Sequence, residues 1–145
     1  MQQSDTRKWL EYHHEVTFAD TNMVGNVYFA TYFMWMGKCR DLVMAEHYPK
    51  IREHIRDGFG FATEHAHIDF LHETFLFDKV CVRMTIEGLS RTRIEFVYEF
   101  VNTANETILA KGSQAVVWVN AQHRPSLMPD ELYAKACEFS GLTPE

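Results

Sequence analysis

The hydrophobic period of this sequence changes once, near residue 59, and that change strongly limits the folds that the chain can adopt. Between Val27 and His47, apolar side chains recur at spacings of three and four, which indicates one face of a long helix. Beyond residue 59 the runs are β-type, and over residues 80–87 apolar and polar side chains alternate as on a half-buried strand. The four β-type runs are FGFATEHAHIDFL, KVCVRMTIEGL, TRIEFVYEFVN and ETILAKGSQAVVWVN. A long helix and an antiparallel sheet bury each other's apolar faces in two layers, so this order predicts an α+β fold.

Shorter segments complete the predicted order of elements. Residues 11–18 are β-prone and predict a first strand before the helix. Pro49 ends the regular part of the helix, and one or two further turns precede Gly58. Pro129 and Gly141 bracket a short C-terminal helix. No repeat or linker interrupts this order, and 145 residues suffice for one core, so we expect a single domain over residues 1–145.

Charge and cysteine content narrow the class of protein. A formal net charge of -6, without a stripe of lysine and arginine, argues against a nucleic-acid partner. No run approaches the roughly 18 apolar residues of a membrane span, and the first residues lack an apolar signal core, so we expect a cytoplasmic protein without a membrane partner. The three cysteines cannot all pair in disulfides, and we expect them as buried apolar side chains. His65 and His67 would share one face of a strand, but no third ligand follows at a recognisable spacing, so we expect no metal site.

A polar turn and a wall of aromatic side chains stand together in FADTNMVGNVYFATYF, residues 18–33, and an arginine follows further along the helix. This pattern resembles the D-x-D-x-x-G-x-V-Y/F signature of hotdog-fold acyl thioesterases of the 4-hydroxybenzoyl-CoA thioesterase type. The matching positions are Asp20, Gly25, Val27, Tyr28, Tyr32 and Arg40. The resemblance extends from about Tyr12 to Asn120. It implies a single hotdog domain, in which an antiparallel β-sheet wraps around one long central helix, with acyl thioester hydrolase activity.

One position departs from that signature. Its second acid, the catalytic carboxylate in most such enzymes, is Asn22 here. Within the family, this replacement and the helix ATYFMWMGKCRDL are most similar to the thioesterases of enediyne polyketide biosynthesis. The resemblance implies release of a β-ketoacyl polyene from the acyl carrier protein domain of an iterative polyketide synthase, with decarboxylation of the released acid as a further step. It also implies a homodimer, with a homotetramer expected, and no cofactor beyond the phosphopantetheine that carries the substrate.

Two other functions remain open from the sequence. The first is a general acyl-CoA thioesterase for short or aromatic acyl groups, which Asn22 disfavours because those relatives rely on the acid. The second is a non-catalytic hotdog protein that binds acyl chains. The missing base favours that alternative, whereas the retained Tyr32 and Arg40 disfavour it.

The signature assigns roles around the start of the helix. Gly25 allows a tight turn, and the resemblance places the N–H that binds the acyl oxygen on Phe29, at the positive end of the helix dipole. Val27 is expected to contact the substrate. The side chain of Asn22 is neither a nucleophile nor a base, so we expect it to orient the attacking water. Without the resemblance, Gly25 would be a turn residue, Phe29 a core residue, and Asn22 a turn former or N-cap.

Tyr32, Met36 and Arg40 are four residues apart and therefore line one side of the helix. Met36 is expected to contact the acyl chain. The Arg40 guanidinium can hold a carboxylate or an enolate, or polarise a carbonyl, but it does not serve as a base. Alternatively, Arg40 forms an ion pair with Asp41, Glu46 or a partner subunit. Tyr32 either donates to the attacking water or simply packs.

Thr63 and Glu64 open the other candidate wall of the site. Similar polyketide thioesterases place a threonine in this region beside the arginine, whereas Glu64 would restore the missing base. Neighbouring residues on a strand point in opposite directions, so we favour Thr63 and keep Glu64 as the alternative. Arg91 is expected to meet the phosphopantetheine phosphate, or else to lie in a solvated turn. The candidates for a basic patch that binds the carrier protein are Arg52, Arg56, Arg91 and Arg93.

Overall fold

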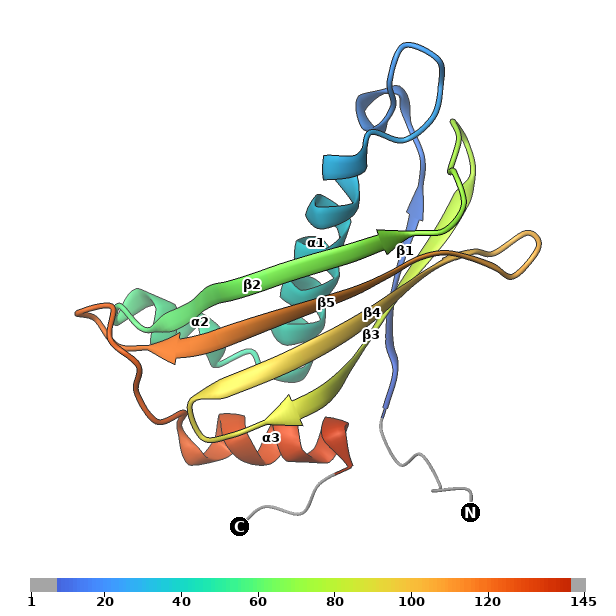
Figure 1. Cartoon of the computed structure of the whole chain (residues 1–145). Helices are drawn as coiled ribbons and strands as arrows, with labels where there is room; N and C mark the ends of the chain where they lie inside the picture. Colours follow the sequence, from blue (N-terminus) through green and yellow to red (C-terminus); the bar gives the residue numbers. More distant parts are fainter. Residues whose placement is uncertain (1–7, 142–145) are drawn as a thin grey trace.

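The computed structural model describes residues 8–141 and confirms the predicted α+β fold (Figure 1). In chain order the elements are β1 (Leu10–Glu15), the 3-10 turn η1 (Phe18–Asp20), α1 (Phe29–His47), α2 (Ile51–Arg56), β2 (Gly60–Phe70), β3 (Lys79–Leu89), β4 (Arg93–Asn102), β5 (Thr107–Val119) and α3 (Asp130–Ser140). The strands form one antiparallel sheet in the order β1-β3-β4-β5-β2. Helix α1 begins two residues later than expected, because Val27 forms a bridge with Thr21 and Tyr28 is extended.

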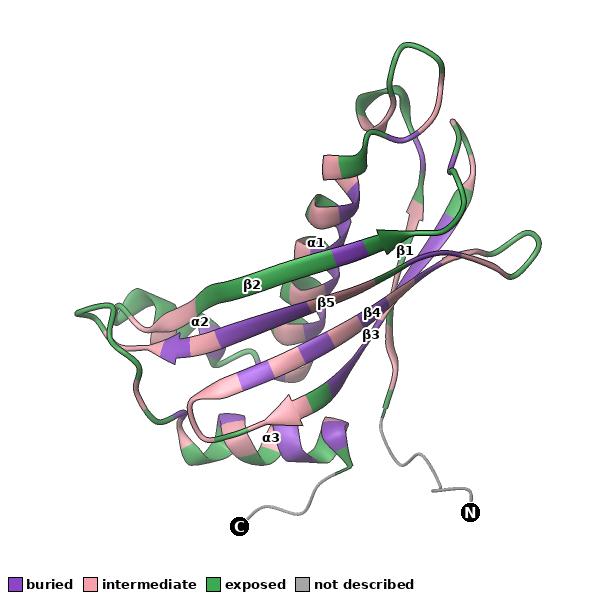
Figure 2. Ribbon diagram, viewed as in Figure 1, coloured by how far each residue is buried: buried purple, intermediate pink, exposed green. Residues whose placement is uncertain are grey.

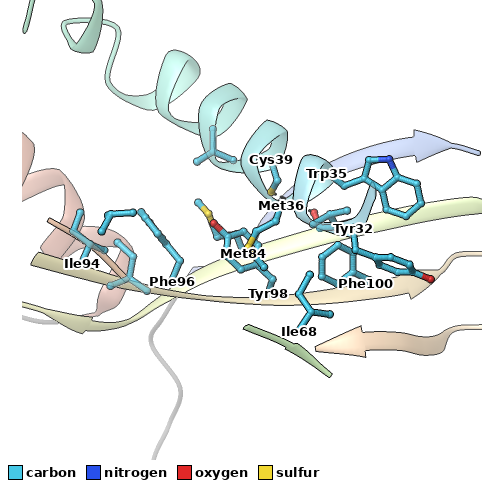
Figure 3. Close-up of a cluster of buried hydrophobic side chains, with 14 of the residues drawn as sticks. Tyr32, Trp35, Met36, Cys39, Ile68, Met84, Ile94, Phe96, Tyr98 and Phe100 are labelled. Carbon is cyan, nitrogen blue, oxygen red and sulfur yellow. Dashed lines mark hydrogen bonds between the residues drawn. The ribbon is translucent and has the colours of Figure 1, made fainter. Parts of the chain in front are cut away.

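The core lies between α1 and one face of the sheet. The side chains that α1 buries are Tyr32, Trp35, Met36, Cys39 and Val43. Figure 3 shows Tyr32, Met36 and Cys39 of this set above Met84, Tyr98 and Phe100 on the strands. Phe29, which would be a core residue without the family resemblance, is 57% exposed because it starts the helix beyond the edge of this core.

A glycine in β5 sets how closely α1 approaches the sheet. A Cβ atom at Gly112 would lie 2.8 Å from the Cε of Met36 and 3.3 Å from a side-chain carbon of Ile68. A side chain at that position would push the end of Met36 away and crowd Ile68. The absence of a side chain at Gly112 therefore lets Met36 pack directly on the sheet, and α1 lies across its centre.

Strand β2 is an exposed edge of the sheet. It pairs with β5 on one side, and residues 8–141 provide no strand for its other side. Six successive β2 residues, 62–67, are exposed, as the long green segment of β2 in Figure 2 shows. An edge strand of this length presents unpaired backbone N–H and C=O groups to another chain.

The expectations for the cysteines and for the C-terminal helix are met within residues 8–141. Cys39, Cys81 and Cys137 are buried and free, as predicted. Helix α3 ends at Gly141, whose φ of +75° is the left-handed conformation that favours glycine after a helix. Within this described part of the chain, no helix has both the length and the apolar character needed to cross a membrane.

Candidate active site

The turn before α1 is a compact loop closed by backbone hydrogen bonds. The Asn22 N–H donates to the Asn26 carbonyl at 2.7 Å, and the Gly25 N–H donates to the Asn22 carbonyl at 3.0 Å. Gly25 has a φ of +88°, a region that other residues adopt only with strain. The Val27 N–H then donates to the Thr74 carbonyl at 2.8 Å, which joins the turn to the loop between β2 and β3.

Asp20, the first acid of the signature, supports this turn. Its carboxylate accepts the Thr17 backbone N–H and lies near the Nε2 atom of His14, each at 2.9 Å, and its carbonyl accepts the Tyr28 N–H at 3.0 Å. Burial alone would raise the pKa of Asp20, but the hydrogen bonds from His14 and Thr17 outweigh it and hold the pKa below its ordinary value. Asp20 is therefore ionised at neutral pH and anchors the entry to α1.

A cleft of about 450 Å³ opens at the N-terminal end of α1. Its walls are Asn22, Asn26, Val27, Tyr28, Phe29 and Tyr32 on one side, and Phe70, Leu71, His72, Glu73 and Thr74 on the other. The structure thus brings together Asn22, Val27, Phe29 and Tyr32 of the predicted site. Phe29 is the first residue of α1, and within residues 8–141 its N–H has no hydrogen-bond acceptor. This N–H is an available donor at the positive end of the helix dipole.

Tyr32 holds the far wall of the cleft in place. Its hydroxyl lies 2.6 Å from the Thr74 hydroxyl, and both side chains are buried. The Tyr32 ring packs edge-on against Phe70 and Phe100. Burial raises the pKa of Tyr32, so the phenol stays protonated at neutral pH. Because this hydroxyl is bonded to Thr74, the structure favours packing and positioning for Tyr32 over direct donation to a water.

A carboxylate that we did not predict reaches this cleft. The Asn22 Nδ2 donates to the Asn26 Oδ1 at 3.3 Å, and the Asn26 Nδ2 donates to the Glu73 Oε1 at 3.4 Å. Glu73 lies 47 residues from Asn26 along the chain. No local pattern around Glu73 indicates this contact, because the antiparallel bridge between Asn26 and Phe75 creates it.

Arg40 lies away from this cleft, on the same helix. It is eight residues beyond Tyr32, or about 12 Å along the helix axis. Its Nε and Nη2 atoms donate to the Asp41 Oδ1 at 3.0 and 2.9 Å, which is one of the ion pairs considered for it. The side chain is 21% exposed and borders a small apolar hollow of about 50 Å³ together with Phe61 and Phe96.

Thr63 and Glu64 diverge, as the strand geometry predicts. The Thr63 hydroxyl accepts a hydrogen bond from the Gln114 Nε2 at 2.9 Å. Glu64 occupies a β-bulge, and its carboxylate accepts from the Arg93 Nε at 2.9 Å. Arg93 also donates to Glu95 at 2.7 Å. Glu64 therefore belongs to an ion-pair cluster apart from the cleft, which disfavours it as the base.

Two further predicted contacts lie elsewhere. Met36 is 2% exposed and packs over Gly112, so it fills the core beneath α1 and is absent from the lining of the cleft. Arg91 donates to the Met128 carbonyl at 2.9 Å and to Asp130 at 2.8 Å. These bonds join the loop before β4 to the start of α3 and occupy the guanidinium that we expected at a phosphate.

One cluster has donor atoms close enough for a metal ion. Within residues 8–141, Glu11, His13 and Cys81 bring theirs within 4.8 Å of one another, whereas His65 and His67 belong to no such group. Burial, followed by the negative charge of Glu11, raises the pKa of the Cys81 thiol to about 11. The thiol is therefore protonated at neutral pH, which weakens it as a metal ligand.

Comparison with known proteins identifies the family. The family model of the thioesterase-like superfamily matches residues 16–136. The chain belongs to this superfamily. A curated relative, the 1,4-dihydroxy-2-naphthoyl-CoA hydrolase of Nostoc punctiforme, is 29% identical over 127 residues, covering 83% of this chain and 82% of the relative. The family and its hydrolase relative support an acyl thioester hydrolase, as predicted.

Solved structures of this superfamily share the fold. The dynemicin thioesterase, whose crystal structures reveal effects of polyene binding, is 36% identical with a TM-score of 0.84, covering 91% of this chain and 97% of that one. The 1,4-dihydroxy-2-naphthoyl-CoA thioesterase of Synechocystis is 23% identical with a TM-score of 0.83, covering 90% and 96%. The hotdog fold implied by the sequence is confirmed by these structures and by the sheet around α1.

Proposed function

We propose that this thioesterase hydrolyses a β-ketoacyl polyene bound to an acyl carrier protein in enediyne polyketide biosynthesis, in the cytoplasm. The observation that carries the proposal is Asn22, an amide that lines the cleft at the position where the thioesterase signature has its second acid. The 36% identity with the dynemicin thioesterase supports the same substrate class. Release of a β-keto acid would be followed by loss of CO₂.

The cleft offers two groups for thioester hydrolysis. The Phe29 N–H would donate to the thioester carbonyl oxygen, where negative charge develops as water attacks. The Asn22 side chain would hold that water, since its amide both accepts and donates hydrogen bonds. Removing one donor to such an oxyanion typically slows catalysis by about 10² to 10³. Without a general base, the enzyme lacks a further factor of about 10² to 10⁴ in rate and is therefore slow.

Pairing of two subunits would complete the site. Antiparallel pairing of β2 with a second copy of itself would satisfy the open edge and extend the sheet across a homodimer. Thr63 lies near one end of β2, and Phe70, at the other end, lines the cleft. In such a pair, Thr63 of one subunit approaches the cleft of the other. Two of these dimers would form the homotetramer.

The carrier protein needs a basic surface, because carrier proteins are usually acidic and this chain has a net charge of -6. Arg91 is bonded to α3, and Arg93 is paired with Glu64 and Glu95. Arg52 and Arg56 on α2 are exposed and have no salt bridge within residues 8–141. They are the positions that we assign to carrier protein binding.

A second function has its own support. The Nostoc punctiforme relative hydrolyses an aromatic acyl-CoA, and Glu73 places a carboxylate in the cleft. If Glu73 acts as a general base, the protein is an acyl-CoA thioesterase whose catalytic acid lies in the loop between β2 and β3 and not in the turn before α1. The substrate and the rate distinguish this function from the first.

The deciding experiment is single-turnover hydrolysis with two substrates, a β-ketoacyl carrier protein and an aromatic acyl-CoA, followed by mass spectrometry. We expect faster release from the carrier protein, with free acid and decarboxylated ketone as products. The variant Arg52→Glu/Arg56→Glu should slow the carrier protein reaction and leave the acyl-CoA reaction unchanged. Faster turnover of the acyl-CoA would support the second function. Binding of both thioesters without product would identify an acyl-binding protein.

A further inference from the structure

A hydrogen-bonded chain of three side chains crosses the face of the sheet that packs against α1. The Tyr98 hydroxyl donates to the Gln114 Oε1 at 3.2 Å, and the Gln114 Nε2 donates to the Thr63 Oγ1 at 2.9 Å. The three residues come from the neighbouring strands β4, β5 and β2. Figure 3 shows Tyr98 among the side chains between α1 and the sheet.

Gln114 is unusual for its position. It is 6% exposed, and the β5 residues that share its face of the sheet are small or apolar, namely Ala110, Gly112 and Val116. A buried amide is costly unless its polar atoms are bonded, and here the Gln114 oxygen and nitrogen are both bonded. Gln114 therefore joins the buried Tyr98 hydroxyl to the edge strand β2 through Thr63.

The two hydrogen bonds are donated in one direction, from Tyr98 to Gln114 and from Gln114 to Thr63. A phenol has one proton, and Tyr98 gives it to the oxygen of the Gln114 amide. The amide then presents only its NH₂ group to Thr63, whose oxygen accepts. The Thr63 hydroxyl keeps its own proton for another acceptor. Burial raises the pKa of Tyr98 far above its ordinary value, so this direction is fixed at neutral pH.

The free end of this hydrogen-bonded chain is the Thr63 hydroxyl, on the edge strand β2. Thr63 is exposed in the single chain, so its hydroxyl is open to a ligand. Phe61, two residues earlier and therefore on the same face of β2, borders the apolar hollow with Arg40. An oxygen held at Thr63 would meet the hydroxyl as a donor, because the Thr63 oxygen already accepts from Gln114.

We propose that Tyr98 and Gln114 are positioning residues that orient the Thr63 hydroxyl as a hydrogen-bond donor to the β-keto oxygen of the substrate. The inference deepens the proposed function and rests on it for the nature of the acyl group. A ketone oxygen only accepts hydrogen bonds, so it matches a hydroxyl that is held as a donor. A saturated acyl chain would leave that donor unsatisfied, so the Tyr98–Gln114–Thr63 hydrogen bonds select β-ketoacyl over plain acyl thioesters.

The test compares two pantetheine thioesters of equal length, one β-ketoacyl and one saturated. The measured quantity is the ratio of their kcat/KM values. We expect Thr63→Val and Gln114→Met each to reduce this ratio by about tenfold, because each removes the donor or its orientation. Thr63→Ser should retain the ratio. The double variant should lose no more than either single variant, because both act on one hydrogen bond.

A matched control lies next to Gln114 in the sequence. Ser113 points to the opposite face of β5, so Ser113→Ala should leave the ratio unchanged. Thermal unfolding of every variant separates a folding defect from a change in selectivity. If Gln114→Met slows both substrates equally while folded, or if Thr63→Val keeps the ratio, the proposal is wrong.

Binding measurements test this inference independently of the proposed function. The dissociation constants of two non-hydrolysable pantetheine thioethers, β-ketoacyl and saturated, report the same preference without turnover. A wild type that hydrolyses neither thioester contradicts the proposed function. If it still prefers the β-ketoacyl thioether, and Gln114→Met abolishes that preference, the positioning role stands. Equal binding of both thioethers by the wild type overturns it.

Discussion

The hydroxyl of Tyr32 lies 2.6 Å from the hydroxyl of Thr74, and this buried contact joins α1 to the loop that forms the far wall of the cleft. The same loop accepts the Val27 N–H through the Thr74 carbonyl. Two hydrogen bonds at Thr74 thus fix the loop against both the turn and the helix. The width of the cleft therefore depends on Thr74.

Tyr32→Phe should destabilise the fold by about 1–3 kcal/mol, because it leaves the buried Thr74 hydroxyl without a partner. Thr74→Val should destabilise the fold by a similar amount, because the buried Tyr32 hydroxyl would lose its partner. The double variant should be more stable than the sum of the two losses predicts, since neither polar group is left unpaired. Urea denaturation measures all three free energies of unfolding, and strict additivity would show that the contact contributes nothing.

Gly25→Ala should destabilise the chain by about 1–2 kcal/mol, because the φ of +88° at this turn is unfavourable for a residue with a Cβ atom. Free space around the added Cβ means that the cost is one of backbone strain. Gly60→Ala is the matched control, since Gly60 also has free space and lacks a positive φ. Equal stability of the two variants would contradict the strain at Gly25.

Glu73→Gln should reduce single-turnover hydrolysis by less than about tenfold if Asn22 alone positions the water. A general base typically contributes about 10² to 10⁴ in rate, so a loss of that size would identify Glu73 as the base. Asn22→Ala should lose about 10² under the first mechanism. Glu87→Gln, on the exposed end of β3, controls for the change in net charge.

The Asp20 carboxylate should make stability depend on pH in acid. Its folded pKa lies below the ordinary value of 3.8, so its contribution is complete above that value and is lost as pH falls toward the folded pKa. Asp20→Asn should therefore lower the free energy of unfolding at pH 7, by about 1.5–3 kcal/mol from the loss of charged hydrogen bonds. Below about pH 4 the difference from the wild type should shrink. A constant difference in the free energy of unfolding across this range would show that the charge of Asp20 does not stabilise the turn.

The sequence predicts those parts of the site that lie close together along the chain. Asn22, Phe29 and Tyr32 share one cleft because a single turn and the first helical turn of α1 carry all three. Periodicity likewise predicts the helix and the strands, since the buried stripe of α1 is a local pattern. The prediction that residues 80–87 form a half-buried strand is wrong in part, because Cys81 and Thr85 on the second face of β3 are buried as well.

Long-range contacts decide what the sequence could not predict. Glu73 reaches Asn26 across 47 residues, and Arg91 reaches Asp130 across 39. Gln114 bonds to both Tyr98 and Thr63 only because β5 lies between β4 and β2 in the sheet. In each case an ordinary polar residue on a strand or loop acquires a partner through tertiary packing, which the residue's own neighbours in sequence do not encode.

Because the edge of β2 is open, the thermal stability of this protein should depend on its concentration. If two copies pair along it, each unfolding event must also separate a dimer, so the midpoint of thermal unfolding should rise as the protein becomes more concentrated. A newly made chain would carry a long, bare strand until it meets another, and the same backbone groups that build the dimer would recruit misfolded neighbours if that meeting is slow. If the dimer forms, rapid pairing would protect this strand from such contacts.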